Sequence, residues 1–89
     1  MKRLTIIVSG RVQGVFFRAS TKDEADLLSV NGFVRNEPNG DVYIEAEGDE
    51  MQLEKFLNWC RKGPPRSIVE KIITSEKEIA GFKNFEVRR

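Results

Sequence analysis

The chain contains no histidine and a single cysteine among its 89 residues. Without histidine the commonest general base of enzymes is missing, so any catalysis must proceed without an imidazole. The lone Cys60 excludes a disulfide within the chain, and one cysteine without histidine offers no plausible set of zinc ligands. We therefore expect neither a bound metal nor another cofactor.

An excess of one charge and long apolar runs are lacking as well. The 15 Lys and Arg residues and 14 Asp and Glu residues leave a formal net charge of +1, whereas a general nucleic-acid binder depends on a strongly positive field. The apolar run near the start, Leu4–Val8, is too short for a signal-peptide core or a membrane span. We expect no nucleic-acid or membrane partner, a cytoplasmic location, and one monomeric domain over residues 1–89.

Hydrophobic periodicity and turn residues predict the order of the elements. Strands are expected at 4–9, 33–37, 42–48 and 68–76, helices within 17–30 and from 49 to about 62, and a short closing strand at 85–87. In the third strand Val42, Ile44 and Ala46 are expected inside, and Tyr43, Glu45 and Glu47 in solvent. The mixed pattern of the fourth strand leaves its register open.

Local sequence also predicts where the helices start and stop. Thr21-x-x-Glu24 has the form of a capping box, with the alternative that the first helix starts one turn earlier. Asp49 is expected to cap the second helix, which Gly63-Pro64-Pro65 ends.

The order β-α-β-β-α-β with a terminal strand predicts an α+β, ferredoxin-like sandwich, in which two helices cover one face of an antiparallel sheet. In that fold the first and second strands run parallel with the third between them. The loop after the first strand and the end of the second therefore lie at the same edge of the sheet, roughly 10 Å apart.

The segment Gly10–Arg18 follows the first strand and leads into the first helix. Gly10 and Gly14 allow a tight turn, and N–H groups that converge at a helix start form an anion site. Arg18 adds a guanidinium that matches phosphate or carboxylate oxygens two at a time. The alternative is a simple turn followed by a solvated arginine.

Asn36 is the second candidate. It shares the inward side of the second strand with Val34, and a buried amide needs a partner because an unpaired one costs about 1–3 kcal/mol. The alternative is a turn asparagine that bonds its own backbone before Pro38. Asn39, within the turn Pro38-Asn39-Gly40, is assigned that structural role.

Two segments resemble the acylphosphatase family. The residues Gly-Arg-Val-Gln-Gly-Val-Phe-Phe-Arg at 10–18 are similar to its signature, and Gly32-Phe33-Val34-Arg35-Asn36 with Gly40 and Val42 are similar to its second block. The resemblance implies a metal-independent enzyme that hydrolyses the carboxyl–phosphate bond of acyl phosphates. It also implies that Arg18 binds phosphate, that Asn36 positions the attacking water, and that inorganic phosphate is a product and competitive inhibitor. The phosphate-binding loop would comprise Gln13, Gly14, Val15, Phe16, Phe17 and Arg18.

Two rival functions share the predicted fold. An RNA-recognition module would stack bases on aromatic residues of its first and third strands, but only Tyr43 is available there, beside two acids. A non-catalytic anion-binding or regulatory domain stays open.

The remaining conspicuous residues have structural interpretations. Trp59 and Cys60 are expected to pack, Phe16 and Phe17 to anchor the loop beneath the anion site, and Arg61, Lys62, Arg88 and Arg89 to be solvated.

Overall fold

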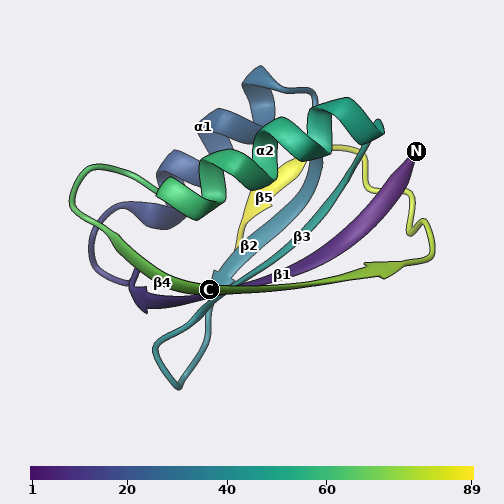
Figure 1. Cartoon of the computed structure of the whole chain (residues 1–89). Coiled ribbons are helices and arrows are strands. Elements are labelled where there is room, and N and C mark those ends of the chain that lie inside the picture. Colours follow the sequence, from purple (N-terminus) through teal and green to yellow (C-terminus); the bar gives the residue numbers. More distant parts are fainter.

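Seven helices and strands follow one another in the computed structural model, which describes all 89 residues. The strands are β1 (Lys2–Arg11), β2 (Asn31–Asn36), β3 (Val42–Gly48), β4 (Ile68–Lys77) and β5 (Phe85–Val87), and the helices are α1 (Phe17–Leu27) and α2 (Glu50–Lys62). They form a five-stranded sheet in the order β4-β1-β3-β2-β5, with both helices on the same face (Figure 1). The predicted ferredoxin-like sandwich is confirmed.

The sheet is mixed rather than wholly antiparallel. The four long strands pair antiparallel, as predicted, whereas the short β5 runs parallel to β2. Because β3 lies between β1 and β2 and is antiparallel to both, β1 and β2 run parallel. Their carboxyl ends therefore lie at the same edge of the sheet, where the β1–α1 loop begins.

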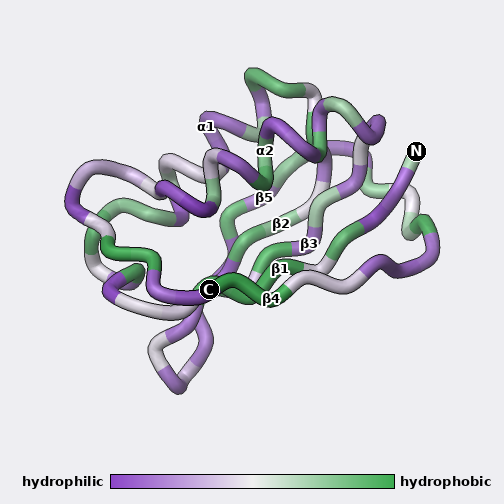
Figure 2. Tube along the Cα trace, in the orientation of Figure 1, coloured by the Kyte–Doolittle hydropathy of each residue, from purple (hydrophilic) through white to green (hydrophobic).

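The core lies between the helices and the sheet. Figure 2 shows apolar segments along the strands, and hydrophilic residues on the outer turns of the helices and in the hairpin after β2. The burial of apolar surface in this layer is the main force that holds the fold together. Val42, Ile44 and Ala46 of β3 are buried as the alternation predicts, and α2 buries Leu53, Phe56 and Cys60.

An irregularity in β4 explains why its register is hidden in the sequence. Val69 and Ile72 both pack against the core, although residues three apart point to opposite faces of a regular strand. In the pairing with β1, Ser9 lies opposite Lys71 but Gly10 lies opposite Val69, so one residue of β4 has no counterpart. This bulge shifts the alternation and lets both apolar side chains face inward.

The first helix begins one turn before a cap at Thr21 would place it, which agrees with the stated alternative, and the second begins directly after Asp49 as predicted. α1 begins at Phe17, so Thr21 lies inside the helix, fully buried, and its hydroxyl donates to the Phe17 carbonyl at 2.7 Å. The capping box at Thr21 is wrong because this hydroxyl bonds the preceding turn. Asp49 stands at the N-cap of α2 as predicted, without a side-chain capping hydrogen bond. Neither helix has the length and apolar character that a membrane crossing requires.

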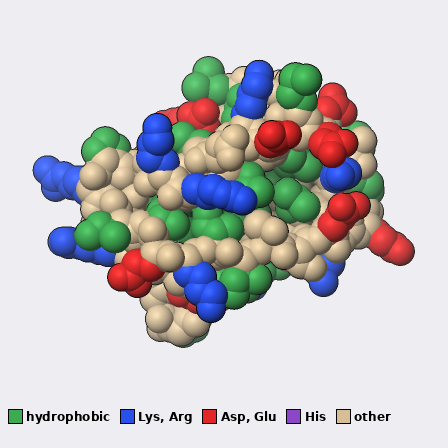
Figure 3. Space-filling view, viewed as in Figure 1, with side chains coloured by type: hydrophobic (Ala, Val, Ile, Leu, Met, Phe, Trp, Pro, Cys, Tyr) green, Lys and Arg blue, Asp and Glu red, His purple; other side chains and the backbone are tan.

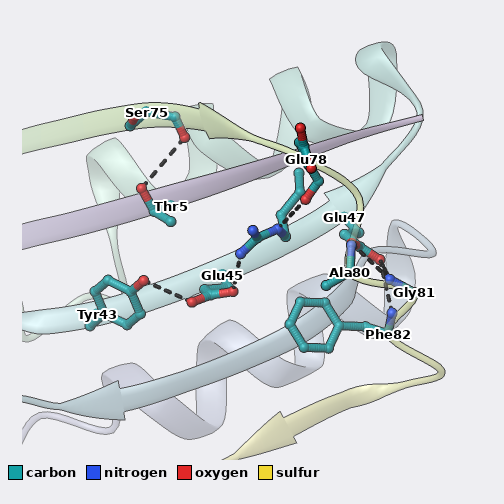
Figure 4. Close-up of polar contacts among 10 residues, drawn as sticks. Thr5, Tyr43, Glu45, Glu47, Ser75, Glu78, Ala80, Gly81 and Phe82 are labelled. Atoms are coloured by element: carbon teal, nitrogen blue, oxygen red, sulfur yellow. Dashed lines mark hydrogen bonds and ion pairs between the residues drawn. The ribbon is translucent and has the colours of Figure 1, made fainter.

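Glu47 is buried, with 2% of its surface exposed, although the alternation in β3 predicts it in solvent. The prediction is wrong because the segment after β4 packs against this side chain. The carboxylate accepts N–H groups from Ala80, from Gly81 at 3.1 Å and from Phe82 at 2.9 Å (Figure 4). Burial by itself raises the pKa of Glu47, but these donors outweigh it and the pKa is lowered.

Candidate active site

The loop between β1 and α1 turns through left-handed backbone conformations. Gly14 has a φ of 73°, and Phe16, at the N-cap of α1, has a φ of 65°. None of the 11 backbone hydrogen bonds outside helices and strands has a donor N–H between Gln13 and Ala19. The first N–H groups of a helix also lack acceptors within it. The loop and the helix start thus present several unpaired N–H donors, which is an arrangement that binds anions.

A cavity of about 560 Å³ lies beside this loop. It brings together Arg18, in the first turn of α1, and Asn36, at the end of β2. The nine lining residues are Val12, Gly14, Phe16, Phe17, Arg18, Ala19, Asn36, Val87 and Arg89. No aspartate or glutamate is among them, so the ionised side chains of the cavity wall are two arginines.

The guanidinium of Arg18 is held by the backbone near the end of the chain. Its Nη1 donates to the carbonyl of Arg88 at 3.1 Å, and the N–H of Arg88 donates to the carbonyl of Val34 in β2 at 2.8 Å. A guanidinium has five N–H donors in a rigid plane. One contact therefore orients Arg18 and leaves other donors for a ligand.

The side chain of Asn36 has an acceptor without a partner. Its Oδ1 is buried and accepts no hydrogen bond, so the alternative of a turn asparagine that bonds its own backbone does not hold. A buried polar atom in this state is rare and costs about 1–3 kcal/mol. Asn36 is also one of the residues that line the cavity.

Gln13 and Asn39 stabilise the hairpin between β2 and β3. Nε2 of Gln13 donates to the carbonyls of Glu37 and Asp41, each at 2.8 Å, and so ties the β1–α1 loop to this hairpin. Asn39 bonds within the turn, since its Oδ1 accepts the N–H of Asp41 at 3.0 Å, which confirms its structural assignment. Gln13 and Val15 are not among the residues that line the cavity.

The two phenylalanines at the start of α1 differ in burial. Phe17 and Val15 are buried and anchor the loop, and Phe17 packs on Trp59 with ring centroids 5.6 Å apart. Cys60 is fully buried, so the packing assignment of Trp59 and Cys60 is confirmed. Phe16 is 73% exposed. The prediction that it anchors the loop is wrong, because its left-handed backbone at the N-cap leaves the ring outside the core.

The residues after β5 contribute to the cavity, which the sequence reasoning missed. Val87 and Arg89 line it, whereas Arg88, between them, places its guanidinium carbon 4.0 Å from the centroid of the Phe33 ring. Arg88 also pairs with Glu86 at 2.8 Å. Both arginines are exposed as predicted, but neither is merely solvated. The contribution of these residues to the cavity follows from the pairing of β5 with β2, and no local sequence pattern encodes that pairing.

The charge distribution favours an anion at this end of the molecule. In Figure 3 most acidic side chains gather at the end that holds the N-terminus, and basic ones project at the opposite end, where the β1–α1 loop lies. Burial raises the pKa of the Cys60 thiol, and burial together with a hydrogen bond to Glu45 raises the pKa of Tyr43. Neither residue lines the cavity. No three side chains of His, Cys, Asp or Glu gather to hold a metal ion.

Comparisons with known proteins agree on one family. The family model for acylphosphatase matches residues 4–87. An acylphosphatase of Methanocella arvoryzae is 46% identical over 88 residues, which cover 99% of this chain and 100% of the relative. The crystal structure of acylphosphatase from Bacillus subtilis matches with a TM-score of 0.97 and 39% identity over the whole of both chains.

One similar structure is a much longer protein. Full-length HypF, solved in a phosphate- and nucleotide-bound form, matches 99% of this chain with a TM-score of 0.89 and 30% identity, but the match covers 12% of HypF. The full-length matches to acylphosphatases decide the assignment. The chain belongs to the acylphosphatase family and has the acyl phosphate hydrolase activity of that family.

Proposed function

We propose that Arg18, Asn36 and the N–H groups of the β1–α1 loop carry out the hydrolysis of acyl phosphates in the cavity between α1 and the end of β2. The observation that supports this most strongly is that Asn36, whose Oδ1 is buried and unpartnered, lines the same cavity as Arg18. One residue offers charge for phosphate oxygens, and the other offers a hydrogen-bond acceptor for water.

The phosphate binds first to the positive side of the cavity. Arg18 donates N–H groups to its oxygens, and the free N–H groups of residues 13–18 donate from the β1–α1 loop and the start of α1. Hydrolysis of a phosphate ester or anhydride needs positioning and stabilisation of charge on the equatorial oxygens more than covalent catalysis. Donors that are fixed before the reaction supply that stabilisation without reorganisation.

Asn36 orients the nucleophile. A water that donates one hydrogen bond to Oδ1 is held with its oxygen directed at the phosphorus, in line with the leaving carboxylate. The water oxygen forms a bond to phosphorus, and the bond between phosphorus and the acyl oxygen breaks. The acyl oxygen keeps the electron pair, and the products are a carboxylate and inorganic phosphate.

The proton of the water goes to the substrate itself. No aspartate, glutamate or histidine lines the cavity, so we assign the role of base to a non-bridging phosphate oxygen. No strong general acid is needed, because the leaving group is a carboxylate of low pKa. Catalysis in a chain without histidine is therefore chemically consistent.

Substitution of the two residues separates their roles. Arg18→Ala is expected to abolish competitive inhibition by inorganic phosphate and to lower kcat/KM for benzoyl phosphate by roughly 10³-fold or more. Arg18→Lys keeps the charge but loses the planar guanidinium, so it should recover only part of the phosphate inhibition and of kcat/KM. Retained phosphate affinity in Arg18→Ala would contradict the assigned role.

Asn36→Ala is expected to leave the inhibition constant of phosphate nearly unchanged while kcat falls by roughly 10²- to 10³-fold. Asn39→Ala, three residues away and outside the cavity, is the matched control and should keep kcat. A variant at Asn36 that loses phosphate affinity but keeps kcat would refute the water-positioning role.

The non-catalytic anion-binding or regulatory alternative is not favoured, because the full-length matches are to acylphosphatases. Spectrophotometric hydrolysis of benzoyl phosphate, with and without EDTA, tests the proposed reaction. Hydrolysis at background rate would contradict the proposed site, and loss of activity with EDTA would contradict a metal-independent reaction. Competitive inhibition by phosphate, the monomeric state and the cytoplasmic location stay predictions.

A further inference from the structure

The cavity is larger than the reacting groups require. A phosphate and one water, the latter occupying about 30 Å³ in the liquid, fill only a small part of about 560 Å³. The remaining wall lies beside the place where the acyl group of a bound acyl phosphate must lie. Its composition therefore bears on which acyl groups the enzyme accepts.

Arg89 reaches this cavity because the chain after β5 continues beside β2, where the N–H of Arg88 donates to the carbonyl of Val34. Successive side chains of an extended segment point to opposite sides. Arg88 lies over Phe33 on the sheet face away from the helices, so Arg89 shares the opposite side with Val87, and both line the cavity. The environment of Arg89 thus follows from the same alternation that places Arg88 outside.

Unlike the side chain of its neighbour, the side chain of Arg89 forms no ion pair with another residue. Arg88 pairs with Glu86 at 2.8 Å, whereas no ion pair or hydrogen bond of the structure involves Arg89. With Arg18, it makes two cationic side chains on the wall of one cavity that is lined by no aspartate or glutamate. Their mutual repulsion is relieved when anionic groups bind.

Apolar side chains are exposed at the same cavity. Phe16 is 73% exposed and Val87 is 44% exposed, and both line the wall. Carbon atoms of an acyl chain could cover these surfaces and gain the free energy of apolar burial. The cavity therefore combines a phosphate site, apolar wall and a second cation.

We infer that Arg89 forms a second anion-binding position, which gives the enzyme a preference for acyl phosphates whose acyl group carries a further negative charge. This rests on the proposed placement of the reacting phosphate at Arg18 and the loop N–H groups. Those groups bind the phosphate from the β1–α1 loop and α1, whereas Arg89 extends into the cavity from the residues after β5. The phosphate end and the acyl end of one ligand therefore contact different parts of the fold. The rival arrangement has Arg89 on the same phosphate as Arg18.

Two substrates of equal length test the inference. Succinyl phosphate and butyryl phosphate have the same four-carbon acyl chain, ending in a carboxylate in the first and a methyl group in the second. The measured quantity is the ratio of kcat/KM for succinyl phosphate to that for butyryl phosphate. The ratio cancels general effects on folding or on the reacting phosphate.

Arg89→Gln is expected to lower this ratio by about three- to fivefold, the size of a well-placed ion pair at a partly exposed site. Arg89→Lys should recover most of the loss, and 0.5 M salt should lower the wild-type ratio because it screens exposed charges. Lys77→Gln is the matched control, since Lys77 ends β4 opposite Arg3, at the far end of β1 from the loop. It should leave the ratio unchanged.

Three results would overturn the inference. In the first, the ratio does not change in Arg89→Gln. In the second, Lys77→Gln lowers the ratio as much as Arg89→Gln does, which indicates a general electrostatic field of the protein. In the third, Arg89→Gln slows the hydrolysis of both substrates equally and weakens inhibition by inorganic phosphate, which places Arg89 on the reacting phosphate. Failure of the proposed site is distinct, because Arg18→Ala would then still hydrolyse both substrates.

Discussion

Substitution of Glu47 by glutamine removes a buried negative charge at the point where the segment after β4 meets β3. The carboxylate accepts three backbone N–H groups, those of Ala80, Gly81 and Phe82. Glutamine keeps one acceptor oxygen, but its amide nitrogen then faces an N–H donor. At least one backbone donor is left without a partner, and the hydrogen bonds that remain have a neutral acceptor instead of a charged one.

The size of the loss follows from these contacts. A hydrogen bond to a charged group contributes about 1.5–3 kcal/mol, and a neutral one about 0.5–1.5 kcal/mol. One lost charged bond and two weakened ones give a destabilisation of about 3.5–6 kcal/mol for Glu47→Gln. For a domain of this size that corresponds to a fall in Tm of roughly 15–35 °C.

Urea unfolding followed by circular dichroism measures this difference. Glu76→Gln is the matched control, because Glu76 is exposed and its only ion pair, with Lys2, spans 3.9 Å. An exposed pair of that kind is expected to contribute less than about 0.5 kcal/mol. A loss below 0.5 kcal/mol in Glu47→Gln would refute the role assigned to its hydrogen bonds.

The pH dependence gives an independent test. The pKa of Glu47 in the folded chain is lowered from its usual value, in spite of burial, by the three N–H donors and by Arg3, its partner in the pairing of β1 with β3. The resulting stabilisation is fully present above the unfolded pKa of about 4.3 and is lost as pH falls through the folded pKa. The gap in unfolding free energy between wild type and Glu47→Gln should therefore be constant from pH 7 to about 5 and shrink below about 4. A gap that is equal at pH 7 and pH 3 would show that ionisation of Glu47 is irrelevant.

Backbone fit and thiol burial are testable in the same way. In Gly10→Ala the new Cβ would lie 2.2 Å from the carbonyl oxygen of Ile68, whereas in Gly40→Ala nothing lies within 4 Å, and both positions have positive φ. We expect Gly40→Ala to cost about 1–2 kcal/mol for its conformation and Gly10→Ala clearly more in urea unfolding; equal losses would contradict the steric argument. Burial raises the pKa of Cys60, so a disulfide reagent at pH 8 should label it only after denaturation; rapid labelling of the folded protein would show that this core opens.

Most of the fold could be predicted because its elements are encoded locally. The alternation of Val42, Ile44 and Ala46 and the spacing of Leu53 and Phe56 define a strand and a helix without tertiary information. The order of the elements then places the ends of β1 and β2 at one edge of the sheet. That topology brings the two candidate residues together before any side-chain contact is known.

Predictions failed where one segment covers or displaces another. Glu47 follows the polar alternation of β3, but the segment after β4 contacts it and supplies its partners. The bulge opposite Gly10 breaks the period of β4, so Val69 and Ile72 face inward together. Each of these outcomes depends on contacts between residues far apart in the chain, which local propensity does not carry.

The same reason accounts for the residues at the end of the chain. Arg88 and Arg89 form a dipeptide that by composition alone looks like a solvated end, yet β5 fixes the direction of both. Its parallel pairing with β2 aligns Val87 with Val34, and the N–H of Arg88 bonds the carbonyl of Val34. With that register set, alternation places one guanidinium outside the sheet and the other in the cavity, while the carbonyl between them restrains Arg18. A one-residue slip of β5 would exchange the two side chains. The cavity therefore depends on a three-residue strand that lies far from the signature segment in the sequence.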